Sequence, residues 1–170
     1  MCGGKVVIVL MGVAGAGKTT IGQLLAAQLH WLFADADDYH SPANIAKMRA
    51  GIPLTDEERE PWLETLRMLI TGWIVSGQNA VLACSALKHS YRERLRVATE
   101  TQFVYLKVSP EILRERLRAR HGHYMTEKML ASQLATLEEP QQAIVVDGDG
   151  TPDEIISEIL VSLKLAKVSS

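Results

Sequence analysis

The sequence predicts a single α/β domain in which helices sandwich a parallel sheet. Short apolar runs alternate with helical patterns along the chain, and a glycine-rich stretch follows the first run. Because alternating strands and helices are joined by crossover connections, the strands are expected to pair in parallel. The chain has 170 residues, and nothing in it reads as a linker or repeat, so we expect one domain over residues 1–170.

Short runs rich in apolar and β-branched residues are expected to form the strands. Residues 6–10 and 103–108 are apolar almost throughout, as in strands covered on both faces. The expected strands are residues 6–10, 32–34, 80–83, 103–108 and 143–146. In sheets of this kind ligands bind at the carboxyl ends of the strands, which is where a functional site is expected.

Capping signals mark the starts of several helices between these strands. Thr55 with Glu58, and Thr151 with Glu154, fit the capping box, in which each side chain satisfies a backbone donor at the helix start. Ser41, Ser109 and Thr151 each precede a proline, which is favoured at the first helical position. These signals predict helix starts near residues 42, 56, 110 and 152.

The composition excludes several functional classes. The formal net charge of −2 argues against a general electrostatic grip on nucleic acid or on an acidic membrane. The two cysteines, Cys2 and Cys84, provide neither a disulfide framework nor a zinc site. No apolar run approaches the roughly 18 residues of a membrane span, and the first residues lack a signal-peptide pattern. We therefore expect a cytoplasmic protein.

The glycine-rich stretch after the first strand matches the pattern G-x-x-x-x-G-K-[ST]. The backbone N–H groups of such a loop wrap a phosphate chain, and the following helix points its positive end at the same place. Lys18 is expected to reach the β- and γ-phosphates, and the Thr19 hydroxyl to hold Mg²⁺. The residues expected to contact ATP are Gly12, Val13, Ala14, Gly15, Ala16, Gly17, Lys18, Thr19 and Thr20.

Three aspartates follow the second strand, at Asp35, Asp37 and Asp38. A kinase needs one acid near Mg²⁺ and one that takes the proton of an acceptor hydroxyl. Asp35 and Asp37 face the same way if the strand continues, whereas Asp38 faces the opposite way. The spacing alone leaves open which of the two is the base and which lies beside the metal.

Basic residues are concentrated in the second half. Lys88, Arg92 and Arg96 recur every four residues, which is the usual pattern of an exposed charged helix face. Alternate arginines over residues 114–120, before a glycine-containing break, predict a mobile lid around residues 114–126. His121 and His123 form an H-x-H pair without a third ligand nearby, so a metal site there is not expected.

Together these segments resemble bacterial gluconate kinases, also called gluconokinases. They occur in the family's order and are "GVAGAGKTT", "DADDYH", "KMRAGIPLTDEEREPWL", "CSALKHSYR", "GHYM" and "SQLATLEEP". The resemblance implies a P-loop kinase fold similar to shikimate and nucleoside monophosphate kinases. It also implies transfer of the ATP γ-phosphate to the 6-hydroxyl of D-gluconate, with Mg²⁺, and a homodimer.

The resemblance also implies roles for individual residues. Asp37 would contact the acceptor hydroxyl, and Asp35 would lie in the metal shell. Arg116 and Arg120 would lie near the phosphates and, with Lys18 and Asp37, carry the catalysis. The expected substrate contacts are Asp37, His40, Arg49, Arg59, Lys88, Arg92 and His123.

Two alternatives stay open at this point. Another small-molecule kinase of the same fold is one, although a shikimate kinase would show a glycine triplet where this chain has Cys84-Ser85-Ala86. The other is an ATP-binding regulatory module without transfer activity. Such a module would need neither an acceptor-side base nor an arginine-rich lid, so Asp37 and the basic segment argue against it.

Overall fold

The computed structural model describes residues 4–120 and 126–165. In this part of the chain the strands are β1 (Val7–Met11), β2 (Leu32–Asp35), β3 (Ala80–Ala83), β4 (Thr101–Lys107) and β5 (Ile144–Asp147). They pair in parallel throughout, in the order β2-β3-β1-β4-β5. The predicted α/β class is confirmed, and both ends of each expected strand lie within two residues of the ends of an observed strand.

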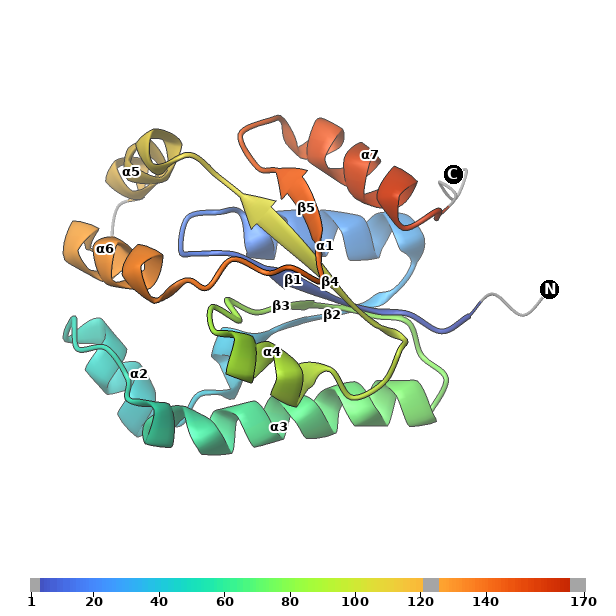
Figure 1. Ribbon diagram of the computed structural model, residues 1–170, viewed down its shortest axis with the longest axis horizontal. Coiled ribbons are helices and arrows are strands. Elements are labelled where there is room, and N and C mark those ends of the chain that lie inside the picture. Colours follow the sequence, from blue (N-terminus) through green and yellow to red (C-terminus); the bar gives the residue numbers. More distant parts are fainter. Residues whose placement is uncertain (1–3, 121–125, 166–170) are drawn as a thin grey trace.

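Helices cover both faces of the sheet (Figure 1). The α-helices are α1 (Lys18–Leu29), α2 (Pro42–Arg49), α3 (Asp56–Val75), α4 (His89–Leu95), α5 (Pro110–Ala119), α6 (Glu127–Thr136) and α7 (Pro152–Ser162). A 3₁₀ turn, η1 (Ala36–Tyr39), follows β2. Helices α1 and α7 pack against one face of the sheet, and α3 and α4 against the other.

Strand β1 shows why the central strands are apolar on both sides. Ile8 and Leu10 belong to the core under α1 and α7, whereas Val7, Val9 and Met11 belong to the core above α3. All five side chains are fully buried. Alternate residues of a strand point to opposite faces, so a strand covered twice needs an apolar residue at every position.

The local helix signals act as the sequence indicates. Both capping boxes are formed, by Thr55 with Glu58 at the start of α3 and by Thr151 with Glu154 at the start of α7. The Ser41 side chain accepts a hydrogen bond from the backbone N–H of Asn44 at the start of α2. These caps fix the residue at which each helix begins and therefore the residue at which the preceding loop ends.

Candidate active site

The phosphate loop lies between β1 and α1, at the carboxyl edge of the sheet. Gly15 and Gly17 have φ angles of 84° and 93°, in the left-handed region that glycine adopts without a Cβ penalty. A Cβ on Gly12 would lie 3.1 Å from the Leu106 carbonyl oxygen, so this position also favours glycine. The glycine spacing therefore serves the backbone path of the loop as well as its access to a ligand.

Three side chains hold the loop in shape. Lys18 Nζ donates to the Val13 carbonyl over 3.0 Å, and Arg116 donates to the Gly15 carbonyl over 3.1 Å. Gln133, on α6, accepts a hydrogen bond of 2.7 Å from the Ala14 backbone N–H. Arg116 also donates to the Gly148 carbonyl, so it ties the loop to the turn before α7.

Thr19 and Asp35 come together beside the loop. The Thr19 hydroxyl donates to Asp35 Oδ2 over 2.6 Å, and Asp35 Oδ1 accepts the backbone N–H of Asp37. Strand β2 ends at Asp35, and the next four residues form η1, so the condition under which Asp35 and Asp37 would face the same way, a strand that continues, is not met. Asp35 caps η1 instead, and both carboxylates still line the cavity beside Lys18.

A cavity of about 400 Å³ brings these groups together with Arg59. Arg59 and nearby Lys88 form what we call the basic wall. Phosphate-loop residues, Asp35, Asp37, His40 and Arg59 all line the cavity. Burial lowers the pKa of the Lys18 ammonium, while the charge of Asp37 acts in the opposite direction. Arg120 also lines the cavity. The sequence segments therefore converge on one site from widely separated positions.

His40 is held against Trp62 at the floor of the site. The two rings stack with centroids 4.3 Å apart and planes 10° apart. Trp62 Nε1 donates to the Ala36 carbonyl over 2.7 Å, which fixes η1 and hence the backbone that carries Asp37. Burial lowers the pKa of His40 to about 4, with a further contribution from the charge of Arg59. The imidazole is therefore neutral at physiological pH.

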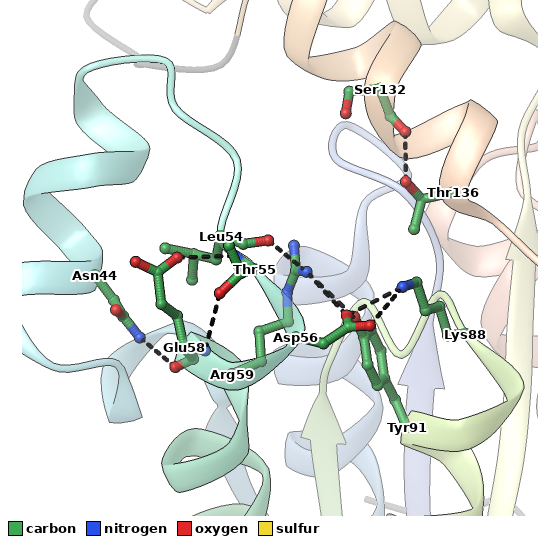
Figure 2. A network of polar contacts seen from close by, with 10 residues as sticks. All are labelled: Asn44, Leu54, Thr55, Asp56, Glu58, Arg59, Lys88, Tyr91, Ser132 and Thr136. Atoms are coloured by element: carbon green, nitrogen blue, oxygen red, sulfur yellow. Dashed lines mark hydrogen bonds and ion pairs between the residues drawn. The ribbon is translucent and has the colours of Figure 1, made fainter.

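The basic wall contains a carboxylate of its own (Figure 2). Lys88 Nζ lies 3.0 and 2.9 Å from the two carboxylate oxygens of Asp56, and the Tyr91 hydroxyl donates to Oδ1 of the same group. Arg59 Nη1 donates to the Leu54 carbonyl and to the Tyr91 hydroxyl. Asp56, Arg59 and Lys88 border a second cavity of about 310 Å³, whereas Tyr91 lines the first. The two cavities share six lining residues, Met48, Leu54, Arg59, Leu87, Gln133 and Thr136.

Arg92 and Arg49 are not part of this arrangement. The guanidinium of Arg92 is buried and donates to the carbonyls of Ala86, Leu87 and Glu138, so its donors point into the fold rather than into either cavity. Arg49 is exposed in the last turn of α2, outside the residues that line the two cavities. His123 lies outside the described residues.

The expected lid is described only in part. Residues 114–119 form the last turns of α5, whereas residues 121–125 lie outside the described residues. Helix α6, which follows them, is capped by Thr126 and carries Gln133 to the phosphate loop. Sequence reasoning assigned no role to Gln133, Trp62, Tyr91 or Asp56. All four lie in quoted motifs, but nothing local in the sequence indicates their partners.

Comparison with known proteins shows the family to which this chain belongs. The sequence signature of the shikimate kinase family matches residues 14–164. A gluconokinase from Gluconobacter oxydans is 45% identical over 157 residues, which cover 90% of this chain and 88% of that protein. The chain belongs to the gluconokinase family. The resemblance noted in the sequence is therefore confirmed.

Solved structures related to this gluconokinase-family chain share its fold. It superposes on a gluconokinase from Sinorhizobium meliloti 1021 with a TM-score of 0.84 and 38% identity, covering 95% of this chain and 92% of that one. On a sugar kinase from Janibacter sp. HTCC2649 the TM-score is 0.88 at 42% identity, with 96% of each chain covered. The expected P-loop kinase fold is confirmed.

Proposed function

We propose that the protein is a gluconokinase, which transfers the γ-phosphoryl group of ATP to the 6-hydroxyl of D-gluconate and yields 6-phosphogluconate. The observation that carries this proposal is the cavity that unites the phosphate loop and Lys18 with Asp37 and Arg59. It provides a cation for the transferring phosphate, a carboxylate for the acceptor hydroxyl and a cation for an acid group. Family membership supports the choice of gluconate.

On the phosphate side, the loop amides and Lys18 bind the β- and γ-phosphates at the N-terminus of α1. Arg120 faces the same cavity and adds positive charge where negative charge accumulates during transfer. Arg116 acts indirectly, because its guanidinium donates hydrogen bonds to the carbonyls of Gly15 and Gly148 and so keeps the phosphate loop in its binding shape. Transfer then depends mainly on positioning and charge.

Thr19 and Asp35 fit a Mg²⁺ site. A hydroxyl and a carboxylate oxygen lie 2.6 Å apart next to the phosphate loop, and hard oxygen donors of this kind suit Mg²⁺. Within residues 4–120 and 126–165, no group of three or more histidine, cysteine or acidic side chains is placed to hold a metal ion by itself. That agrees with an ion held by one or two protein oxygens and the phosphates themselves. When bound, the ion would neutralise phosphate charge.

On the acceptor side, Asp37 takes the proton of the attacking hydroxyl. The acid end of gluconate extends toward Arg59 and Lys88. Within the described residues, both hydrogen bonds of Arg59 leave from Nη1, so Nε and Nη2 face no partner there. Arg92 supports this wall indirectly, by holding the carbonyls of Ala86 and Leu87 just before Lys88.

Three broader expectations belong to the same proposal. We propose that the chain is one kinase domain whose lid spans residues 114–126, that it forms a homodimer and that it works in the cytoplasm. The described residues contain no helix long and apolar enough to cross a membrane.

The test is an ADP-release assay with the purified chain, ATP and Mg²⁺. We expect turnover with gluconate, and much weaker turnover with glucose and sorbitol, which keep a terminal hydroxyl but lack the carboxylate. Shikimate serves as the acceptor of the alternative kinase class. Efficient turnover of sorbitol would contradict the carboxylate clamp, and acceptor-independent ATP binding without any transfer would favour the regulatory module.

A further inference from the structure

A carboxylate of the chain itself occupies the cation cluster at the acceptor end of the site. Asp56 is the first residue of α3, and Lys88 is the N-cap of α4. Lys88 Nζ contacts both oxygens of Asp56, Tyr91 donates to one of them, and Arg59 Nη1 lies 3.9 Å from the same oxygen (Figure 2). Asp56 therefore bridges two cations that the proposed function assigns to the substrate.

The charge of this region follows from its lining. Among the described residues that border the 310 Å³ cavity, the charged ones are Asp56, Arg59 and Lys88. The others are apolar or neutral, including Ser132 and Thr136 on the facing helix α6 (Figure 2). Two cations and one anion leave a single net positive charge, which matches one carboxylate.

We propose that Asp56 sets the charge selectivity of the acceptor site, by neutralising one of its two cations and so reducing the advantage that a doubly charged acid would have over a singly charged one. This inference rests on the proposed function. The physical reason is that each additional negative charge on a ligand is attracted by Lys88 and Arg59 but repelled by Asp56. A ligand head with two charges experiences this repulsion twice.

The hydrogen bonds to Asp56 keep it charged under working conditions. The bond from Tyr91, and then that from Lys88, hold the pKa of the Asp56 carboxyl below its usual range. An aspartate in the first turn of a helix also interacts favourably with the helix dipole, which alone would give Asp56 a purely structural role. Glu57 occupies the next position of the same turn and is exposed, outside the lining of both cavities. It offers a matched control.

The experiment compares Asp56→Asn with Glu57→Gln and the unmodified chain. Asparagine keeps the shape and an oxygen acceptor for Lys88 and Tyr91 but removes the charge. The probes are gluconate and D-glucitol 1-phosphate, which keeps the carbon chain and the terminal hydroxyl but carries a phosphate with a second pKa of about 6. The KM for gluconate and the inhibition constant of glucitol 1-phosphate are measured at pH 5.5 and at pH 7.5.

At pH 7.5 we expect Asp56→Asn to shift the preference toward glucitol 1-phosphate, relative to gluconate, by roughly 3- to 10-fold, as expected for one charge in a partly exposed site. At pH 5.5 the phosphate carries mostly one charge, so the shift should largely vanish. Glu57→Gln should leave the preference unchanged at both pH values.

An unchanged preference in Asp56→Asn, or an equal shift in Glu57→Gln, would overturn the inference while leaving the proposed function intact. Equal weakening of both ligands would also overturn it, because that result describes a structural clamp. If the unmodified chain does not phosphorylate gluconate at all, the proposed function fails, and this inference fails with it.

Discussion

At the scale of single residues, the lysine at the start of α1 illustrates how the site works. The Lys18 ammonium is held by the Val13 carbonyl and lines the same cavity as the carboxylates of Asp35 and Asp37. Burial lowers its pKa, and the nearby carboxylate charges oppose that shift. A desolvated cation beside the transferring phosphoryl group stabilises charge more strongly than it would in water.

Lys18→Met removes this cation with little change in side-chain length. We expect kcat to fall by roughly two to four decades, because one preorganised charge at a transition state is worth several kcal/mol. Steady-state ADP release measures the effect, and Lys128→Met, at an exposed position on α6, is the matched control. Near-normal turnover of the Lys18 variant would contradict the phosphate-loop assignment.

Asp37→Asn tests the assignment of the base. The amide keeps the shape of the carboxylate but cannot take the acceptor proton, so kcat should fall by roughly 10²- to 10⁴-fold while the KM for ATP changes little. Asp38→Asn, at the neighbouring exposed position in η1, should leave both constants near their original values. A main effect on ATP binding would instead place Asp37 on the metal side and reverse the roles of Asp37 and Asp35.

At the scale of elements, the close seating of α1 on the sheet depends on a missing side chain. A Cβ on Gly22 would lie 2.6 Å from Cε2 of Phe33 in β2, closer than carbon atoms approach each other. Helix α1 also begins directly at the phosphate loop. The same seating that buries Ile21 and Leu25 therefore positions Lys18 and Thr19.

Gly22→Ala should destabilise the protein, although alanine is the better helix former by roughly 1 kcal/mol. Overpacking typically costs about 1–3 kcal/mol, so the clash with Phe33 outweighs the gain in helix propensity. Gly72→Ala provides the opposite case, because nothing lies within 4 Å of a Cβ at that position in α3. We expect the melting temperature to fall for the first variant and rise by a few degrees for the second. Equal effects would contradict the close packing.

At the scale of the whole molecule, the half-buried histidine of the site, His40, makes stability depend on pH. His40 has a pKa of about 4 in the folded chain, below its ordinary value of 6.5. Between these two values the unfolded chain binds a proton that the folded chain does not. Protonation therefore favours unfolding, and the contribution of His40 to stability is lost progressively as the pH falls from about 6.5 to about 4.

His40→Phe keeps an aromatic ring against Trp62 and removes the titration. We expect its free energy of unfolding to fall less steeply than that of the unmodified chain between pH 6.5 and pH 4, as measured by denaturant titration at several pH values. Carboxylates also titrate near the lower end of this range, but they are common to both proteins, so the difference isolates His40. Parallel pH profiles would contradict the lowered pKa.

Much of the fold was predictable because its signals are local. A strand covered on both faces needs consecutive apolar residues, and β1 has them. A capping box needs two residues three positions apart, and both predicted boxes form. The family assignment was predictable for the same reason, since its motifs are contiguous. The shared orientation of Asp35 and Asp37 was conditional on β2 continuing, and β2 instead ends at Asp35, which caps η1 through its own side chain.

The phosphate loop, its lysine and its threonine could be identified from the sequence alone, since the chemistry of that loop depends on neighbours within eight residues. Which of the basic residues face the cavity depends on how distant segments pack. Arg92 and Lys88 lie one helical turn apart, yet Arg92 points into backbone carbonyls and Lys88 meets Asp56. Asp56 is 32 positions from Lys88, and Gln133 is 119 positions from Ala14. Such pairs depend on how α3, α4 and α6 pack around the sheet, and no local pattern in the chain encodes that packing.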